Sequence, residues 1–172
     1  MRIAVFGGTG ATGRILVRKA LEGGHHVVAY ARDPSRLGVA HDHLDTIRGE
    51  LCDAEAIAWA VRGGDAVISI LGPKGRTRGL PIATGMSNIV RAMDLYGVRR
   101  LVATATPSYR DPSDTFDISF SLAVWMIRLF LPSAYRDIVA AAGIVATSDL
   151  DWTLVRIPLL SNTPSSAPLH TG

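Results

Sequence analysis

Short apolar runs alternate along the chain with longer segments in which apolar residues recur every three or four positions. The short runs have the length of strands, and several are apolar at nearly every position, as in strands buried on both faces of a parallel sheet. They cover residues 3–6, 27–31, 44–48, 66–71, 100–105 and 152–156. The longer segments have helical periodicity and cover residues 12–22, 54–61, 81–96, 115–131 and 134–147.

Strands that alternate with helices are typical of βαβ units, whose crossovers are right-handed. The sequence therefore predicts an α/β fold: a Rossmann-type, doubly wound and mostly parallel sheet with helices on both faces and strand order 3-2-1-4-5-6. No internal repeat or low-complexity linker divides the chain, so we expect a single domain over residues 1–172. Residues 161–172 are rich in Ser and Pro and are expected to be extended.

Composition narrows the class of protein. Hydrophobic residues make up 48% of the 172 residues and the mean hydropathy is +0.23, which excludes a disordered chain. The formal net charge is only +3, with no block of Lys and Arg, so charge does not indicate a nucleic-acid partner. The longest apolar stretch, 118–131, contains Arg128 and is shorter than the roughly 20 residues that span a bilayer. We therefore expect no membrane association and a cytoplasmic protein.

A glycine-rich loop lies between the first predicted strand and the first predicted helix. Gly7, Gly10 and Gly13 have the spacing G-x-x-G-x-x-G, a variant of the dinucleotide fingerprint. Such a loop lets the backbone approach a diphosphate, which then lies at the amino end of the helix dipole. The alternative is a glycine-rich turn that binds nothing. We expect phosphate contacts from Gly7, Thr9, Gly10, Ala11, Thr12 and Gly13.

The residue that follows the second predicted strand indicates which dinucleotide binds. NAD sites place an acid about 20 residues beyond the loop, whereas this chain has Arg32 there. A guanidinium binds a 2′-phosphate through charge-assisted hydrogen bonds, so we expect NADP(H) rather than NAD(H). Arg36 is expected to assist. The alternative is that Arg32 is a solvated turn residue beside Asp33.

Five segments together resemble a known family. They are residues 7–13 (GGTGATG), 32–34 (RDP), 49–51 (GEL), 97–102 (GVRRLV) and 148–156 (SDLDWTLVR). This set resembles the atypical short-chain dehydrogenase/reductase superfamily, and within it the NAD(P)H-binding, NmrA-like branch that includes biliverdin and flavin reductases. The resemblance covers nearly the whole chain. Relatives usually continue for another strand and helix beyond the position that corresponds to Gly172.

The resemblance implies roles for further residues. Glu50 and Leu51 would contact adenine, although the family usually has Asp where this chain has Glu. Leu71 and Gly72 would pass the nicotinamide ribose, and Lys74 or Arg76 would lie near the 2′-phosphate. Thr104 and Thr106 would lie beside the nicotinamide.

The chain departs from the superfamily at its usual catalytic motif, Tyr-x-x-x-Lys. Tyr135 lies in the expected helix, but Val139 follows four residues later, and the chain has only two lysines, Lys19 and Lys74. The usual proton donor is therefore absent. Thr106 becomes the candidate catalytic residue, with an orienting role. The alternative is that Thr106 only ends a strand before Pro107.

Two functions fit these observations. The first is an NADPH-dependent reductase that transfers hydride to a small, conjugated, largely apolar acceptor, such as a flavin, a quinone or biliverdin. The second is a non-catalytic NmrA-like redox sensor that binds NADP(H) and acts through a protein partner. The apolar segment 118–131 is then a wall of the pocket, or a surface for a homodimer or a protein partner. An isomerase or epimerase would need the missing acid and fits least.

Two other groups of residues favour structural interpretations. His41, His43 and Asp45 are spaced like metal ligands but lack a further ligand nearby, so a surface loop is expected and no metal site. Cys52, the only cysteine, excludes an internal disulfide and a cysteine metal cluster. We expect it to be a buried, inert thiol beside the adenine site.

Overall fold

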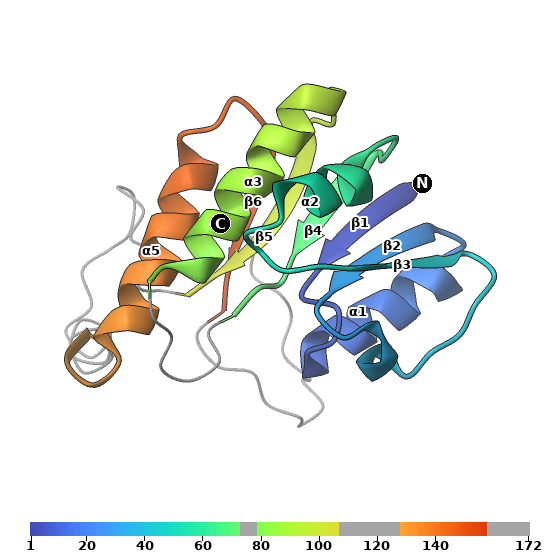
Figure 1. The fold of residues 1–172 in the computed structure, drawn as a ribbon, viewed down its shortest axis with the longest axis horizontal. Coiled ribbons are helices and arrows are strands. Elements are labelled where there is room, and N and C mark those ends of the chain that lie inside the picture. The colour runs from blue at the N-terminus through green and yellow to red at the C-terminus, as the bar shows by residue number, and fades with distance from the viewer. Residues whose placement is uncertain (73–78, 107–127, 158–172) are drawn as a thin grey trace, which may run out of the picture.

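The computed structural model describes residues 1–72, 79–106 and 128–157 (Figure 1). Six parallel strands form one sheet in the order β3-β2-β1-β4-β5-β6. This confirms the predicted Rossmann-type fold and its strand order. The strands are β1 (Arg2–Phe6), β2 (His26–Ala31), β3 (Leu44–Arg48), β4 (Ala66–Ser69), β5 (Arg100–Ala105) and β6 (Asp151–Arg156). The helices are α1 (Ala11–Glu22), the short 3₁₀ helix η1 (Pro34–Leu37), α2 (Ala54–Val61), α3 (Pro81–Tyr96) and α5 (Pro132–Ala146).

Helices cover both faces of the sheet, as predicted. Figure 1 shows α2, α3 and α5 on one face and α1 on the other. Phe6, Tyr30 and Leu101 point from the strands into the core beneath α2, α3 and α5. Val5 and Val27 point into a smaller core beneath α1 and η1. Alternate residues of each central strand therefore face different cores, which is why these strands are apolar at nearly every position.

Two element boundaries differ from the predictions by two residues, and several others differ by one. β4 ends at Ser69 rather than at residue 71, because its neighbour β1 ends at Phe6 and the backbone turns away at Gly7 (φ 89°). α5 begins at Pro132, two residues earlier than expected, because proline fits the first turn of a helix, where its missing N–H costs nothing. The predicted helix over 115–131 lies mostly outside the described residues, as does the segment 161–172.

The carboxyl ends of all six strands lie along one edge of the sheet. From β1 the chain first adds β2 and β3 on one side and then β4, β5 and β6 on the other. The loops that follow β1 and β4 therefore diverge and leave a crevice between them. In open α/β sheets this switch point is where ligands bind. No helix within the described ranges is long and apolar enough to cross a membrane.

Candidate cofactor-binding site

A cavity of about 650 Å³ lies at this switch point. Segments that follow four neighbouring strands line it: the glycine loop after β1, the end of β2, the turn after β3 and the segment after β4. The start of α3 and one residue of α5 close the far side. Eight of the predicted cofactor-binding residues line the cavity: Gly7, Thr9, Gly10, Arg32, Glu50, Leu51, Leu71 and Gly72.

The glycine loop has the geometry of a phosphate cradle. A Cβ on Gly13 would clash with the backbone of Gly7 and Gly8, at 2.7 Å from the Gly8 carbonyl carbon, so only glycine lets α1 lie this close to the loop. The Gly10 N–H bonds to the Gly7 oxygen, and the first N–H bonded within the helix is that of Arg14. The N–H groups of Ala11, Thr12 and Gly13 precede it, and no side chain caps this end. The amino end of α1 can therefore accept an anion.

The amino end of α3 also lies at the cavity, but a side chain caps it. Asp137 of α5 is 1% exposed. Its carboxylate accepts hydrogen bonds from the Ile82 N–H at 3.1 Å and from the Ala83 N–H at 2.8 Å. These bonds satisfy the first donors of α3, since Pro81 has no N–H and the Thr84 N–H bonds to Leu80. Of these two described helix starts, that of α1 is open to a diphosphate and that of α3 is not.

The turn after β3 is held from two sides. The Tyr30 hydroxyl donates a 2.7 Å hydrogen bond to the backbone oxygen of Glu50. The Asn88 side-chain amide, on α3, donates one of 2.9 Å to the backbone oxygen of Leu51. Burial raises the pKa of Tyr30 to about 12, with the Asp53 carboxylate adding to the shift. The phenol therefore stays protonated, and remains a donor, throughout the neutral range.

The prediction that the Cys52 thiol is buried is wrong. Cys52 is exposed and lines the cavity. Residues 51 and 52 form a turn between β3 and α2. Leu51 takes the inward position of this turn, where its side chain packs against Gly85 of α3. The next side chain in the turn therefore opens to the cavity instead of the core.

Positive charge gathers at the end of the cavity near β2. Arg32 is exposed and lines the cavity, whereas Arg36, in the last turn of η1, is exposed and does not line it. Asp33 lies between them in sequence, and its carboxylate accepts a 2.6 Å hydrogen bond from the Ser35 hydroxyl. That bond holds the pKa of Asp33 below its usual range, and the guanidinium groups of Arg36 and Arg48 contribute.

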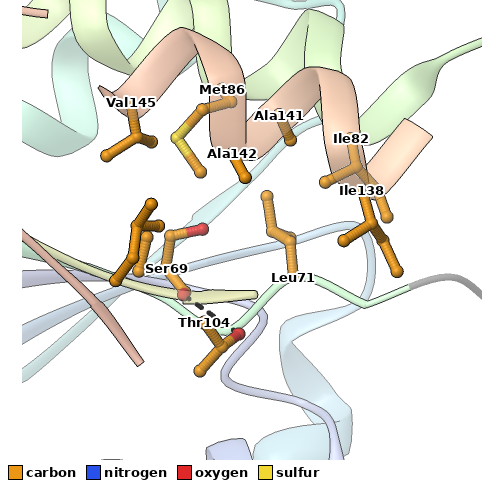
Figure 2. Close-up of a pocket in the computed structure, with 11 residues that line it drawn as sticks. Ser69, Leu71, Ile82, Met86, Thr104, Ile138, Ala141, Ala142 and Val145 are labelled. Carbon is orange, nitrogen blue, oxygen red and sulfur yellow. Dashed lines mark hydrogen bonds between the residues drawn. The ribbon is translucent and has the colours of Figure 1, made fainter. Parts of the chain in front are cut away.

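A second, much smaller cavity of about 10 Å³ lies between the sheet and helices α3 and α5 (Figure 2). Leu71 and Ile82 line both cavities. Thr104 lines the small cavity and not the large one, and its hydroxyl donates a 3.5 Å hydrogen bond to the backbone oxygen of Ser69. The Ser69 hydroxyl is buried and has no hydrogen-bond partner among the described residues.

The remaining predicted residues are placed as follows. Ala11, Thr12 and Gly13 form the first turn of α1 behind the glycine loop. Thr106 is half-buried directly after β5, at the same edge of the sheet as the cavity, although it does not line the cavity. Tyr135 is half-buried on α5 and also lies away from the cavity lining. Lys74, Arg76 and residues 118–127 lie outside the described residues.

His41 and His43 are exposed in the loop before β3, as predicted, and Asp45 lies on β3. His26 of β2 bonds to the Asp45 carboxylate at 2.8 Å. No group of three or more possible ligands in the described part of the chain has the geometry to hold a metal ion.

Asp137 and Asn88 were not predicted from the sequence, although both contribute to the site. Asp137 did leave a signal: it is the single acid of α5, and the apolar run 138–146 follows it directly. A carboxylate in such a stretch is buried only when it is paired or hydrogen-bonded. Asn88 gave no comparable signal, because its partner Leu51 is 37 residues away in the sequence.

Comparisons with known proteins agree with this geometry. A 3-beta-hydroxysteroid dehydrogenase of Mycolicibacterium neoaurum is 37% identical over 119 residues, which cover 62% of this chain and 32% of the relative, so the chain spans about a third of that protein. A short-chain dehydrogenase/reductase of Veillonella parvula, solved with NADP, has a TM-score of 0.74 at 20% identity, over 95% of this chain and 71% of that one. ChuY, an anaerobilin reductase of Escherichia coli O157:H7, has a TM-score of 0.70 at 20% identity, over 91% and 72%.

The two solved structures share the fold of this chain. The family profile described as NAD(P)H-binding matches residues 7–171. That match begins at the first glycine of the phosphate loop and runs through every strand and helix around the cavity after β1. The chain belongs to the NAD(P)H-binding family.

Proposed function

We propose that the chain is an NADPH-dependent reductase that transfers hydride to a conjugated, largely apolar acceptor, such as a flavin, a quinone or a linear tetrapyrrole. The observation that carries the proposal is that one cavity is lined both by groups that can bind phosphates and by apolar side chains. One end combines the uncapped amino end of α1 with Arg32. The other end is lined mainly by apolar side chains: Ile70, Leu71, Leu80, Pro81 and Ile82.

The residues present fit a bound NADP(H). The N–H groups of Ala11 and Thr12 would bind the diphosphate, Arg32 and Arg36 the 2′-phosphate, and Glu50 and Leu51 the adenosine. When bound, NADPH supplies a hydride. The apolar wall would exclude water from the acceptor and hold it flat, and Thr106 would orient its polar edge through a hydrogen bond.

A reductase of this kind tolerates the loss of Tyr-x-x-x-Lys. Val139 stands where the lysine would be, so α5 lacks the lysine that the motif places four residues after the tyrosine. Hydride transfer to a flavin or quinone depends mainly on alignment and on a dry pocket, and the reduced acceptor takes its proton from solvent. Two relatives support a largely apolar acceptor, since one is named as a hydroxysteroid dehydrogenase and the other as an anaerobilin reductase.

A non-catalytic redox sensor is the second candidate, and an exposed apolar surface favours it. Leu129, Phe130 and Leu131 are 56%, 67% and 49% exposed just before α5. Such a surface would fit a protein partner or a second copy of the chain.

NADPH oxidation, followed at 340 nm with a flavin, a quinone and biliverdin as acceptors, tests the proposal. Turnover that falls at least tenfold in Thr106→Val, with NADPH affinity unchanged, supports the reductase. Tight NADPH binding with no turnover on any acceptor supports the sensor instead. Failure of well-folded protein to bind either pyridine dinucleotide contradicts both functions.

A further inference from the structure

The end of β3 brings a third arginine to the positive end of the cavity. Arg48, the last residue of β3, pairs in register with Ala31, the last residue of β2. The backbone confirms this pairing, since the Gly49 N–H donates a 3.2 Å hydrogen bond to the Ala31 oxygen. Arg48 therefore lies beside the strand end from which Arg32 follows.

The three arginines approach that strand end from both faces of the sheet. Ile47 packs into the core beneath α2 and α3, so the next residue, Arg48, points to the opposite face. That face carries η1, whose Leu37 is buried against it and whose last turn contains Arg36. Arg32 lines the cavity together with Tyr30, on the other side of the strand end. A phosphate placed beyond β2 would lie between Arg32 and the pair of Arg36 and Arg48.

The three guanidinium groups are exposed and none forms an ion pair within the part of the chain that the structure describes. The neighbouring acid is Asp33, whose carboxylate bonds to the Ser35 hydroxyl rather than to an arginine. The field of Arg36 and Arg48 reaches this carboxylate, since both favour its ionised form. Three cations against the carboxylate of Asp33 and that of Glu50, which also lines the cavity, leave an excess of positive charge. A dianionic group would bind to that excess.

We propose that Arg48 is a specificity-determining residue that completes a three-arginine site for the 2′-phosphate of NADP(H). The inference rests on the proposed binding of NADP(H) in the cavity. A phosphate monoester presents three oxygens, and Arg48 would bind one that Arg32 cannot reach from the other face. Asp33 acts in the opposite sense, because its ionised carboxylate repels the phosphate. The balance between Arg48 and Asp33 sets how strongly NADP(H) is preferred over NAD(H).

Binding measurements by calorimetry test the proposal without reference to turnover. The ligands are NADPH, NADH, adenosine 2′,5′-bisphosphate and 5′-AMP, and the variants are Arg48→Ala, Arg48→Lys, Asp33→Asn and Arg18→Ala. Arg48→Ala should weaken the two 2′-phosphorylated ligands about 5- to 30-fold, as expected for an exposed charge-assisted contact, and change NADH and 5′-AMP less than about twofold. Arg48→Lys should recover part of the loss, because lysine keeps the positive charge. The recovery should be incomplete, because an ammonium group lacks the bidentate geometry of a guanidinium.

Asp33→Asn should change affinity in the opposite direction and tighten NADPH by about two- to fivefold, as removal of an exposed like charge predicts. Arg18→Ala, which removes one exposed charge from α1 away from the cavity, is the matched control and should change nothing. If the unmodified protein prefers NADPH and Arg48→Ala leaves that preference intact, Arg48 has no such role while the proposed cofactor stands. If the unmodified protein binds NADPH and NADH equally, or neither, the cofactor assignment fails, and Arg48 fails with it.

Discussion

The Tyr30 hydroxyl lies 2.7 Å from the backbone oxygen of Glu50, to which it donates a hydrogen bond across the gap between β2 and the turn after β3. The contact depends on Gly49, since a Cβ there would lie 2.7 Å from the Tyr30 ring carbon that carries the hydroxyl. A buried tyrosine and a glycine together bring the Glu50–Leu51 turn against the end of β2. The turn can then form the adenosine end of the cavity.

Tyr30→Phe is expected to loosen this turn. Loss of a neutral hydrogen bond should lower the free energy of unfolding by about 1 kcal/mol, and it leaves the Glu50 oxygen without this donor. Because adenosine is common to both dinucleotides, NADPH and NADH affinity should fall by the same factor. Chemical denaturation and calorimetry check the two effects. A change in the ratio of the two affinities would contradict the assignment of this turn to adenosine.

The same residue predicts a pH dependence in alkali. The pKa of Tyr30 is about 12 in the folded protein, against an ordinary value of 10.0. A raised pKa means that the stabilisation is complete below pH 10 and is lost as pH rises toward 12. The unmodified protein should therefore lose more stability than Tyr30→Phe over this range, as followed by urea denaturation at a series of pH values. Parallel curves for the two proteins would show that the phenol titrates normally.

Arg32→Ala is expected to separate the two dinucleotides. Loss of a charge-assisted contact with the 2′-phosphate should weaken NADPH by about 1.5–3 kcal/mol and leave NADH nearly unchanged. Isothermal calorimetry at low ionic strength measures both. Arg91→Ala, which removes an exposed arginine from α3, is the control. Equal weakening of NADPH and NADH would show that Arg32 contacts a part of the cofactor that both share.

Local patterns were enough to predict much of the fold and the phosphate loop. Strand β2 and the glycine loop are each contiguous in sequence. The apolar run predicts a buried strand, and the glycine spacing predicts a phosphate loop. Residues brought together by distant contacts were not predictable. Asp137 reaches Ala83 across 54 positions and Asn88 reaches Leu51 across 37. Neither local pattern predicts the partner residue. The first contact forms because α5 packs on α3, and the second because the turn after β3 packs on α3.

Cys52 and Thr104 show a different limit, since their neighbourhoods were predicted and their exposure or direction was not. Cys52 lies beside the expected adenosine site, but the turn directs Leu51 inward and leaves Cys52 exposed. Thr104 lies on the expected strand, yet it lines the small cavity beside Ser69 rather than the large one. Facing direction at a strand end or in a turn is set by one residue of register, and a sequence pattern specifies that register weakly.

Alkylation of Cys52 offers a direct measure of cavity occupancy, because this is the only thiol in the chain. N-ethylmaleimide should react readily with the free protein, and NADPH at saturation should slow the reaction severalfold by covering the thiol. We expect 5′-AMP to protect as NADPH does, and nicotinamide mononucleotide to leave the rate unchanged. Mass spectrometry of timed samples measures the rates. Full reactivity at saturating NADPH would place the adenosine elsewhere.

Ser69→Ala is expected to stabilise the protein. The Ser69 hydroxyl is buried at the small cavity without a hydrogen-bond partner in the described residues, so its removal should raise the free energy of unfolding by about 1 kcal/mol. Ser148→Ala provides the contrast, because that hydroxyl donates a 2.7 Å hydrogen bond to the Val145 oxygen and its loss should destabilise. Urea denaturation compares the two variants. Destabilisation by Ser69→Ala would mean that the buried hydroxyl is in fact satisfied.

Asp137→Ala is expected to cost more stability than removal of any exposed acid. The substitution leaves the Ile82 and Ala83 N–H groups buried without their acceptor and removes the tie between α3 and α5, a loss of about 2–4 kcal/mol for two charge-assisted bonds. Asp94→Ala, on the exposed side of α3, should change stability by less than about 0.5 kcal/mol.

Asp137→Ala also tests whether the Asp137 carboxylate keeps anions away from the amino end of α3. Without the Asp137 carboxylate, the amino end of α3 becomes a second place at the cavity where an anion can bind. Sulfate should then stabilise Asp137→Ala more than the unmodified protein, as thermal unfolding at constant ionic strength would show. Equal stabilisation of the two proteins by sulfate would mean that Asp137 only joins the helices and does not decide where anions bind.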